Sequence, residues 1–93
     1  MKSLPEDVRP YKRTPSFTAE TVPKGLLRQH NTKAGVWGRI YVEEGRLLYR
    51  ILLPVMEEVE LSPGVEGVVE PEVPHEVTPL GEVSFYVEFL RVP

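Results

Sequence analysis

The sequence contains no cysteine, so disulfide bonds and thiolate metal sites are excluded. Any metal site would have to use histidine, carboxylate or backbone oxygen ligands. The chain also lacks an apolar run long enough to cross a membrane, and residues 1–7 contain no apolar stretch of signal-peptide length. We therefore expect a soluble, cytoplasmic protein that does not associate with membranes.

Clusters of positive charge are scarce. The formal net charge is −3, and Lys and Arg are scattered apart from a short group at residues 9–13. Nucleic-acid-binding surfaces are usually strongly basic, so we expect no nucleic-acid partner.

The chain has 93 residues, 41% of them hydrophobic, which suits one small domain with a modest core. The sequence also lacks a nucleophilic triad pattern and a phosphate-binding glycine loop, so catalytic residues are not identified and enzyme activity stays open.

Helical periodicity is missing after residue 20, and short alternating segments take its place. Residues 36–42 alternate as a strand, residues 43–45 are expected to form a hairpin turn, and residues 46–53 form the return strand. Another turn is expected at residues 79–81, before a last strand at residues 83–90. Short strands between Pro and Gly turns predict an all-β barrel or sandwich.

The first fifteen residues show neither a helical nor an alternating pattern, and they contain Pro5, Pro10 and Pro15. We expect an extended arm over residues 1–15, followed by a β-barrel domain over residues 16–93. The arm would lie over the domain or over a partner subunit. A barrel of this size leaves strand edges and an apolar sheet face that association would cover, so we expect a homodimer.

A proline-rich bend precedes one of the chain's histidines. Pro71 and Pro74 each lack a backbone donor and have a fixed φ, so this segment cannot lie in the middle of a β-ladder. Regular pairing is expected to resume at His75, which the bend would present at the start of a strand. A binding site needs a rigidly held imidazole, and a tight turn between two strands needs a stiff bend, so both interpretations stay open.

Two segments resemble the two halves of a cupin signature. The first runs over residues 30–45, and the second begins at Gly67, passes through the prolines and ends at His75. More narrowly, residues 30–38 and 69–75 resemble the TehB/YeaR-like family of small cupins, which is related to tellurite resistance. The resemblance covers nearly the whole chain. It implies a single-domain jelly roll, the double-stranded β-helix, with a site in its mouth.

The resemblance also implies a metal site. In metal-binding cupins the two motifs supply a histidine cluster and a glutamate, and His30 and His75 take two of these ligand positions. Thr32 stands where a further histidine is usual, and residues 36–38 contain no carboxylate. Glu88 is the candidate third ligand if its face of the last strand points inward, and it is solvated if the other face does. The metal would be zinc, nickel, iron or manganese. From the residues alone, two hydrogen-bonded histidines are the alternative.

Further residues are candidates for holding a small-molecule or anionic ligand. Lys33 lies beside His30 in the sequence and would meet an anion at the barrel mouth. Arg39 alternates with Trp37, so it would line the same cavity and hold an anion, or else extend along the surface to the rim. Trp37 and Tyr86 are expected either to contact the ligand or to pack as core or interface aromatics.

These expectations combine into two functional hypotheses. In the first, the chain is a small cupin of the tellurite-resistance or stress-related type that binds a metal ion and a small polar or oxyanionic ligand. In the second, it is a non-catalytic ligand-binding or oligomerisation module without metal. Some members of the resembled family carry a methyltransferase domain on the same chain. The present sequence has no room for one, so we do not expect methyl transfer to be its own activity.

Overall fold

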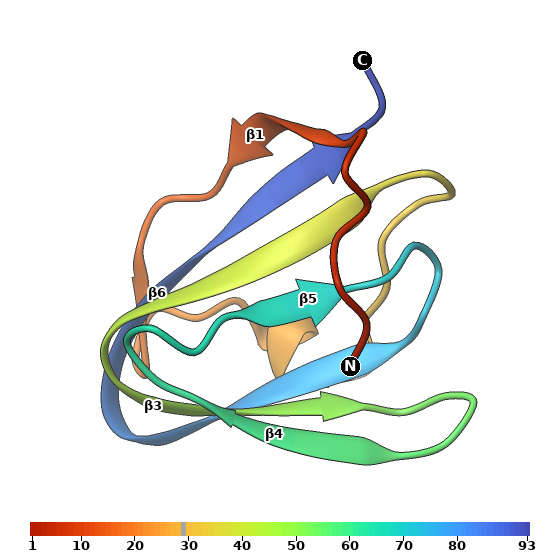
Figure 1. Ribbon diagram of the computed structural model, residues 1–93. Helices are drawn as coiled ribbons and strands as arrows, with labels where there is room; N and C mark the ends of the chain where they lie inside the picture. Colours follow the sequence, from red (N-terminus) through yellow and green to blue (C-terminus); the bar gives the residue numbers. More distant parts are fainter. Residues whose placement is uncertain (29) are drawn as a thin grey trace.

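The computed structural model describes residues 1–28 and 30–93, and strands make up nearly all of its regular structure (Figure 1). The elements in chain order are β1 (Arg9–Arg13), β2 (Phe17–Thr18), the short 3₁₀ helix η1 (Lys24–Leu27), β3 (Trp37–Ile51), β4 (Glu57–Leu61), β5 (Gly67–Val69) and β6 (His75–Arg91). The all-β prediction is confirmed. Within the described ranges, no helix is long and apolar enough to cross a membrane.

The strands form one antiparallel sheet in the order β1-β6-β3-β4, with β2 added beside β6 and β5 beside β3. Its spine is the pair β3 and β6, which runs from Trp37 opposite Leu90 to Ile51 opposite His75 with two shifts of register on the way. The partners in β3 and β6 are far apart in the sequence, so long-range pairing holds this spine together, whereas β3 and β4 pair as a hairpin.

The predicted hairpin at residues 43–45 is wrong, and so is the turn predicted at residues 79–81. Both segments lie inside long continuous strands, and the register of β3 against β6 shifts on both sides of Gly45. Gly45 has a φ of 79°, and a Cβ atom there would collide with the carbonyl oxygen of Glu82. A glycine that was expected to turn the chain back instead allows a bulge, which bends the strand without ending it.

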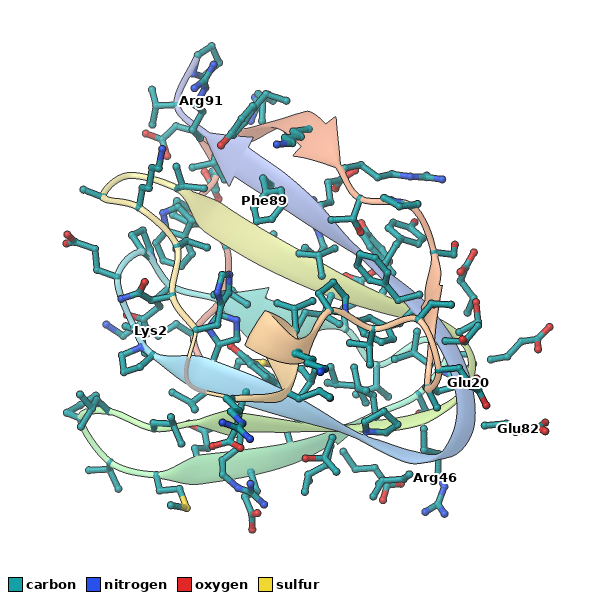
Figure 2. All side chains as sticks on the ribbon, turned by 180° about the vertical axis from the view of Figure 1, so that it is seen from behind. Lys2, Glu20, Arg46, Glu82, Phe89 and Arg91 are labelled. Carbon is teal, nitrogen blue, oxygen red and sulfur yellow. The ribbon has the colours of Figure 1, made fainter. Side chains whose placement is uncertain are left out.

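Because β3 and β6 bend together, the sheet folds over on itself and its two halves face each other (Figure 1). The inner faces meet in one core, where Ile40 and Phe85 from one half pack with Leu47, Tyr49 and Val77 from the other. Figure 2 shows Glu20, Arg46 and Glu82 projecting outward from the end of the molecule where the sheet bends. Charged side chains thus surround the bend, and the apolar ones fill the space between the halves.

From Val83 to Glu88, the side chains of β6 alternate between the two faces of the sheet. Val83, Phe85 and Val87 are buried on the inner face, whereas Tyr86 and Glu88 are half-buried on the outer face. Gly38 and Ile40 of β3 lie opposite inward-facing residues of β6, so they share the inner face. This alternation decides which of the candidate site residues can meet.

The proline bend behaves as the sequence predicted, because β6 begins at His75. The bend includes Glu72, which has a φ of 62° and donates its backbone N–H to the carbonyl of Thr32 at 3.1 Å. His75 and His30 then exchange two backbone hydrogen bonds of 2.8 Å each. The bend therefore attaches the segment around residue 30 to the first residue of β6.

The N-terminal segment lies across its own domain (Figure 1). The Met1 ammonium group pairs with Glu57 of β4, and the Met1 sulfur accepts the backbone N–H of Val68 at 3.1 Å. Val8 is buried, and β1 pairs with the C-terminal end of β6 in the same chain. The division into an arm over residues 1–15 and a domain over residues 16–93 stays a prediction.

Candidate ligand-binding cavity

A cavity of about 240 Å³ lies between the inner faces of the folded sheet. Its wall is apolar over most of its area, with Ile40, Val87 and Phe89 on one side and Leu26 of η1 covering another. The polar residues in the wall are Thr14, Thr32, His30 and His75. No acidic residue is among the described lining residues. The cavity therefore suits a small molecule that is mostly apolar.

His75 is the buried polar residue of this cavity, with only 5% of its surface exposed. Its Nδ1 atom lies 3.2 Å from the carbonyl oxygen of Val73, inside the proline bend. Burial lowers the pKa of His75 below its usual value, because a charged imidazole loses its hydration, and the nearby His30 adds to the effect. The hydrogen bond to Val73 opposes this shift without cancelling it.

His30 lies at the mouth of the cavity and is exposed. Its ring meets the His75 ring edge to face, with the centroids 5.5 Å apart. Tyr49 meets His75 from another side in a similar arrangement, with centroids 5.8 Å apart. The two histidines, distant in the sequence, are thus neighbours in space.

A shallower groove lies next to the cavity on the outside, and His30, Thr32 and Phe89 line both. The groove also carries Lys12 and Lys33. Lys33 and His30 thus line the same groove, at the entrance of the cavity. The part of Lys33 in ligand binding stays a prediction.

Glu88, Arg39, Trp37 and Tyr86 lie on the outer face of the sheet, away from the cavity. Arg39 is directly opposite Glu88, and its Nη2 lies 3.5 Å from the Glu88 carboxylate. Arg39 and Trp37 do not line this cavity with the histidines, because both side chains alternate to the opposite face. A role of these residues or of Tyr86 in ligand binding stays a prediction. Sequence alternation identified which residues share a face, but not which face points inward.

The outer face has its own cluster of aromatic and guanidinium groups. Tyr41 stacks on Tyr86 with ring centroids 4.9 Å apart, and the Arg13 guanidinium lies 4.3 Å above the Tyr86 ring. Arg39 lies 5.4 Å from the Tyr41 ring centre, and its buried Nε atom has no hydrogen-bond partner among the described residues. These contacts resemble ordinary cross-strand packing with cation–π support.

The metal prediction is wrong. Among residues 1–28 and 30–93, no group of three or more potential ligands is arranged to hold a metal ion. Glu88, the expected third ligand, faces the other side of the sheet and pairs with Arg39. His30 and His75 alone supply fewer ligands than a lasting zinc site requires. The acidic recess near the bend, lined by Glu20, Glu44 and Glu82, does not form such a group either.

The sequence did not indicate several of the cavity residues, including Phe17, Leu26 and Gly38. Gly38 lies on the same strand face as Ile40, so its inward position follows from alternation once the core face is known. Nothing in the local sequence of η1 or β2 indicates that they reach the cavity. Their positions depend on long-range packing against β6.

Fold and cavity together define a small antiparallel β domain with an apolar cavity. The family model described as TehB-like domain matches residues 12–87, so this chain belongs to the TehB-like domain family. Two curated relatives, from two strains of Haemophilus influenzae, are each 30% identical over 76 residues, covering 77% of this chain and 27% of the relative. Both are named probable S-adenosyl-L-methionine-dependent methyltransferase TehB.

Solved structures show the same fold. The crystal structure of TehB from Haemophilus influenzae matches with a TM-score of 0.86 and 28% identity, covering 94% of this chain and 32% of that one. A crystal structure of a protein from Escherichia coli strain K12 matches with a TM-score of 0.89 and 22% identity, covering 100% of this chain and 99% of that one. The present chain thus spans between a quarter and a third of the length of its TehB relatives.

These relatives correct the functional expectation. The TehB part of the resemblance is confirmed, whereas the description as a metal-binding cupin is wrong. The relatives are named for S-adenosyl-L-methionine rather than for a metal ion. The cupin motif rested on two histidines at strand ends, and in this fold their rings form part of an apolar wall.

Proposed function

We propose that this chain acts in S-adenosyl-L-methionine-dependent methyl transfer as a non-catalytic domain that holds the methyl acceptor or its methylated product. The observation that carries the proposal is the apolar cavity of about 240 Å³, with His30 at its mouth and His75 buried in its wall, in a domain that matches part of TehB. Such a cavity binds a compact molecule by excluding water from its apolar surface.

The methyl donor itself does not fit the residues of this cavity. S-adenosyl-L-methionine carries a sulfonium and an ammonium charge, and its ribose has two hydroxyl groups. Burying those charges without carboxylate partners costs several kcal/mol, and no acidic residue lines the described wall. At about 240 Å³, the cavity also lies below the range of about 300–1,000 Å³ that is usual for larger ligands. The donor would therefore bind to another part of the methyl-transfer system.

Methylation makes a small molecule more apolar, and each buried methyl group contributes about 0.8 kcal/mol to binding. An apolar cavity next to a basic entrance groove would therefore hold an acceptor before the reaction or a product after it. Lys12 and Lys33 in that groove would attract an anionic molecule toward the mouth. This role needs no metal and no catalytic residue in this chain.

Ligand binding by the isotopically labelled chain tests the proposal, with toluene as the apolar probe and S-adenosyl-L-methionine as the donor. We expect toluene to shift the amide signals of Ile40, Val87 and Phe89 in a saturable manner, and the donor to shift none of them. Val87→Phe should fill the cavity and abolish the toluene effect, while Tyr86→Phe on the outer face should preserve it. Saturable donor binding in the cavity, or no toluene binding, would overturn the proposal.

Two finer expectations from the sequence belong with this proposal. We infer that the folded sheet is a jelly roll, supported by the way β3 and β6 bend together and bring two halves face to face.

We also keep the homodimer as a prediction, supported by exposed apolar residues such as Val55 and Met56 after β3. Light scattering during gel filtration would measure the mass of the particle directly.

A further inference from the structure

His75 has one ring nitrogen that is already engaged and one that is not. Nδ1 lies 3.2 Å from the carbonyl oxygen of Val73. A carbonyl oxygen can only accept, so Nδ1 must carry the proton in this contact. In a neutral imidazole, Nε2 is then an acceptor with a free lone pair.

No residue in the described part of the chain forms a hydrogen bond with Nε2 of His75. The residue as a whole is only 5% exposed. Nε2 is also not among the fully enclosed side-chain atoms that lack a partner. The ring lines the cavity, so this acceptor is open to a molecule bound there. An acceptor with no protein donor favours a ligand that supplies one, because the hydrogen bond forms in a mostly apolar surrounding.

The hydroxyl groups in and next to the cavity wall already have partners. The Thr32 hydroxyl donates to the carbonyl of Val36 at 2.7 Å, and the Tyr49 hydroxyl donates to the carbonyl of Val68 at 2.9 Å. The Thr14 hydroxyl donates to the carbonyl of Pro15 at 2.9 Å and accepts the backbone N–H of Val87 at 3.0 Å. The inner wall therefore offers an acceptor at His75, while its hydroxyl donors are used within the protein.

We propose that the cavity takes a compact apolar molecule with one weakly acidic O–H or S–H group, and that Nε2 of His75 accepts the hydrogen bond from that group. This inference rests on the proposed function and specifies the ligand class of the same cavity. Phenols and thiols are of this class, and both are nucleophiles that a methyl donor can alkylate at oxygen or sulfur. The lysines of the entrance groove would attract an anion to the mouth, but in the inner wall an anion would find no free hydroxyl donor and would lose its hydration, so the acidic group is protonated when it binds there.

The test compares phenol with toluene, which has a similar shape but carries a methyl group in place of the hydroxyl. Binding to the full chain would be measured by titration, and the state of His75 by nitrogen-15 NMR of its ring. In the wild-type chain, phenol should shift the Nε2 signal of His75 and toluene should not. In His75→Phe, the ratio of phenol affinity to toluene affinity should fall about threefold to tenfold, the effect of one net hydrogen bond.

Two further measurements keep the result decisive. If His75→Phe does not fold, the same ratio is measured in the wild-type chain at falling pH, where protonation of Nε2 removes the acceptor and the ratio should fall. The rings packed against His75 are His30 and Tyr49, and the described cavity wall has no carboxylate that would titrate in the same range. Tyr86→Phe on the outer face should leave the ratio unchanged.

The outcomes separate this inference from the proposed function. If toluene binds and the ratio is the same with and without the His75 acceptor, the inference is overturned while the cavity remains a ligand site. If neither probe binds to the wild-type chain, both proposals are overturned.

Discussion

His30 and His75 are joined twice in this protein. Their backbones exchange hydrogen bonds of 2.8 Å in each direction, and their rings meet edge to face with centroids 5.5 Å apart. One histidine is exposed at the cavity mouth and the other is buried inside. These contacts therefore fix the position of His30 at the cavity mouth relative to His75 in the cavity wall.

Stability should depend on pH through His75. Burial lowers its pKa in the folded protein, so the folded state favours the neutral ring more than the unfolded state does. The contribution is fully present above the unfolded pKa of about 6.5 and is lost as pH falls through the lowered folded pKa. Urea unfolding at a series of pH values should show this loss in the wild-type chain beyond the loss in His75→Phe. Identical pH profiles for the two proteins would contradict the prediction.

Gly45→Ala should be strongly destabilising. The residue needs a φ of 79°, and a Cβ atom would collide with the backbone of Glu82 in the neighbouring strand. The positive φ alone costs about 1–2 kcal/mol for alanine, and the collision adds to it. Gly81→Ala is the matched control, because Gly81 has a φ of 90° but open space around its Cβ position. Denaturant unfolding should rank Gly45→Ala clearly below Gly81→Ala; equal losses would refute the role of the close approach.

Tyr49→Phe tests the hydroxyl that links the core to β5. This hydroxyl donates to the carbonyl of Val68 at 2.9 Å, and the side chain is almost completely buried. Removing the donor should cost about 1–3 kcal/mol of unfolding free energy, because the carbonyl loses its partner. Tyr41→Phe, on the half-buried outer face, should cost less than about 0.5 kcal/mol. A loss in Tyr49→Phe no larger than that of Tyr41→Phe would argue against the hydrogen bond.

Added metal ions should not stabilise the protein. His30 and His75 have no third ligand in the described part of the chain, so a zinc ion would be held by too few protein groups to survive dialysis. We expect the same melting temperature with a chelator and with one equivalent of zinc, nickel, manganese or iron(II). Retention of metal near one ion per chain after dialysis, lost in His75→Phe, would be the contrary result.

Glu88→Gln should have a small effect on stability and none on the cavity. The Glu88 carboxylate lies 3.5 Å from Arg39, and both side chains keep about a fifth of their surface exposed, at 20% and 24%. Ion pairs in such positions contribute about 0–1 kcal/mol. Toluene and phenol affinities should be unchanged within error, because Glu88 faces away from the ligand. A change in either affinity would mean that the outer face is coupled to the cavity.

The strand content was predictable, but the connections were not. Most of residues 36–42 and 46–53 lie in the strand Trp37–Ile51, as predicted, and the main error was the hairpin between the two segments. Glycine with a positive φ serves both a hairpin turn and a bulge, so local sequence cannot distinguish the two. Pairing with β6 distinguishes them here, because Gly45 faces a backbone more than thirty residues away in the sequence.

The candidate site likewise has features that were predictable from the sequence and features that were not. The proline bend and the placement of His75 at a strand start follow from the fixed φ of proline and its missing donor, so they were predicted from a few adjacent residues. The inner or outer position of Glu88 was left open by the sequence, because alternation produces two faces and large side chains occupy both.

The sequence by itself determined an all-β chain without cysteine and a stiff bend that begins β6 at His75, since composition, alternation and proline geometry act over short distances. Only the tertiary structure decided that Phe85 and Val87 face the core, that Glu88 meets Arg39, and that His30 meets His75. The physical reason is that burial is a property of the whole folded sheet: the face that closes against the other half becomes the core, and no local pattern specifies that partner.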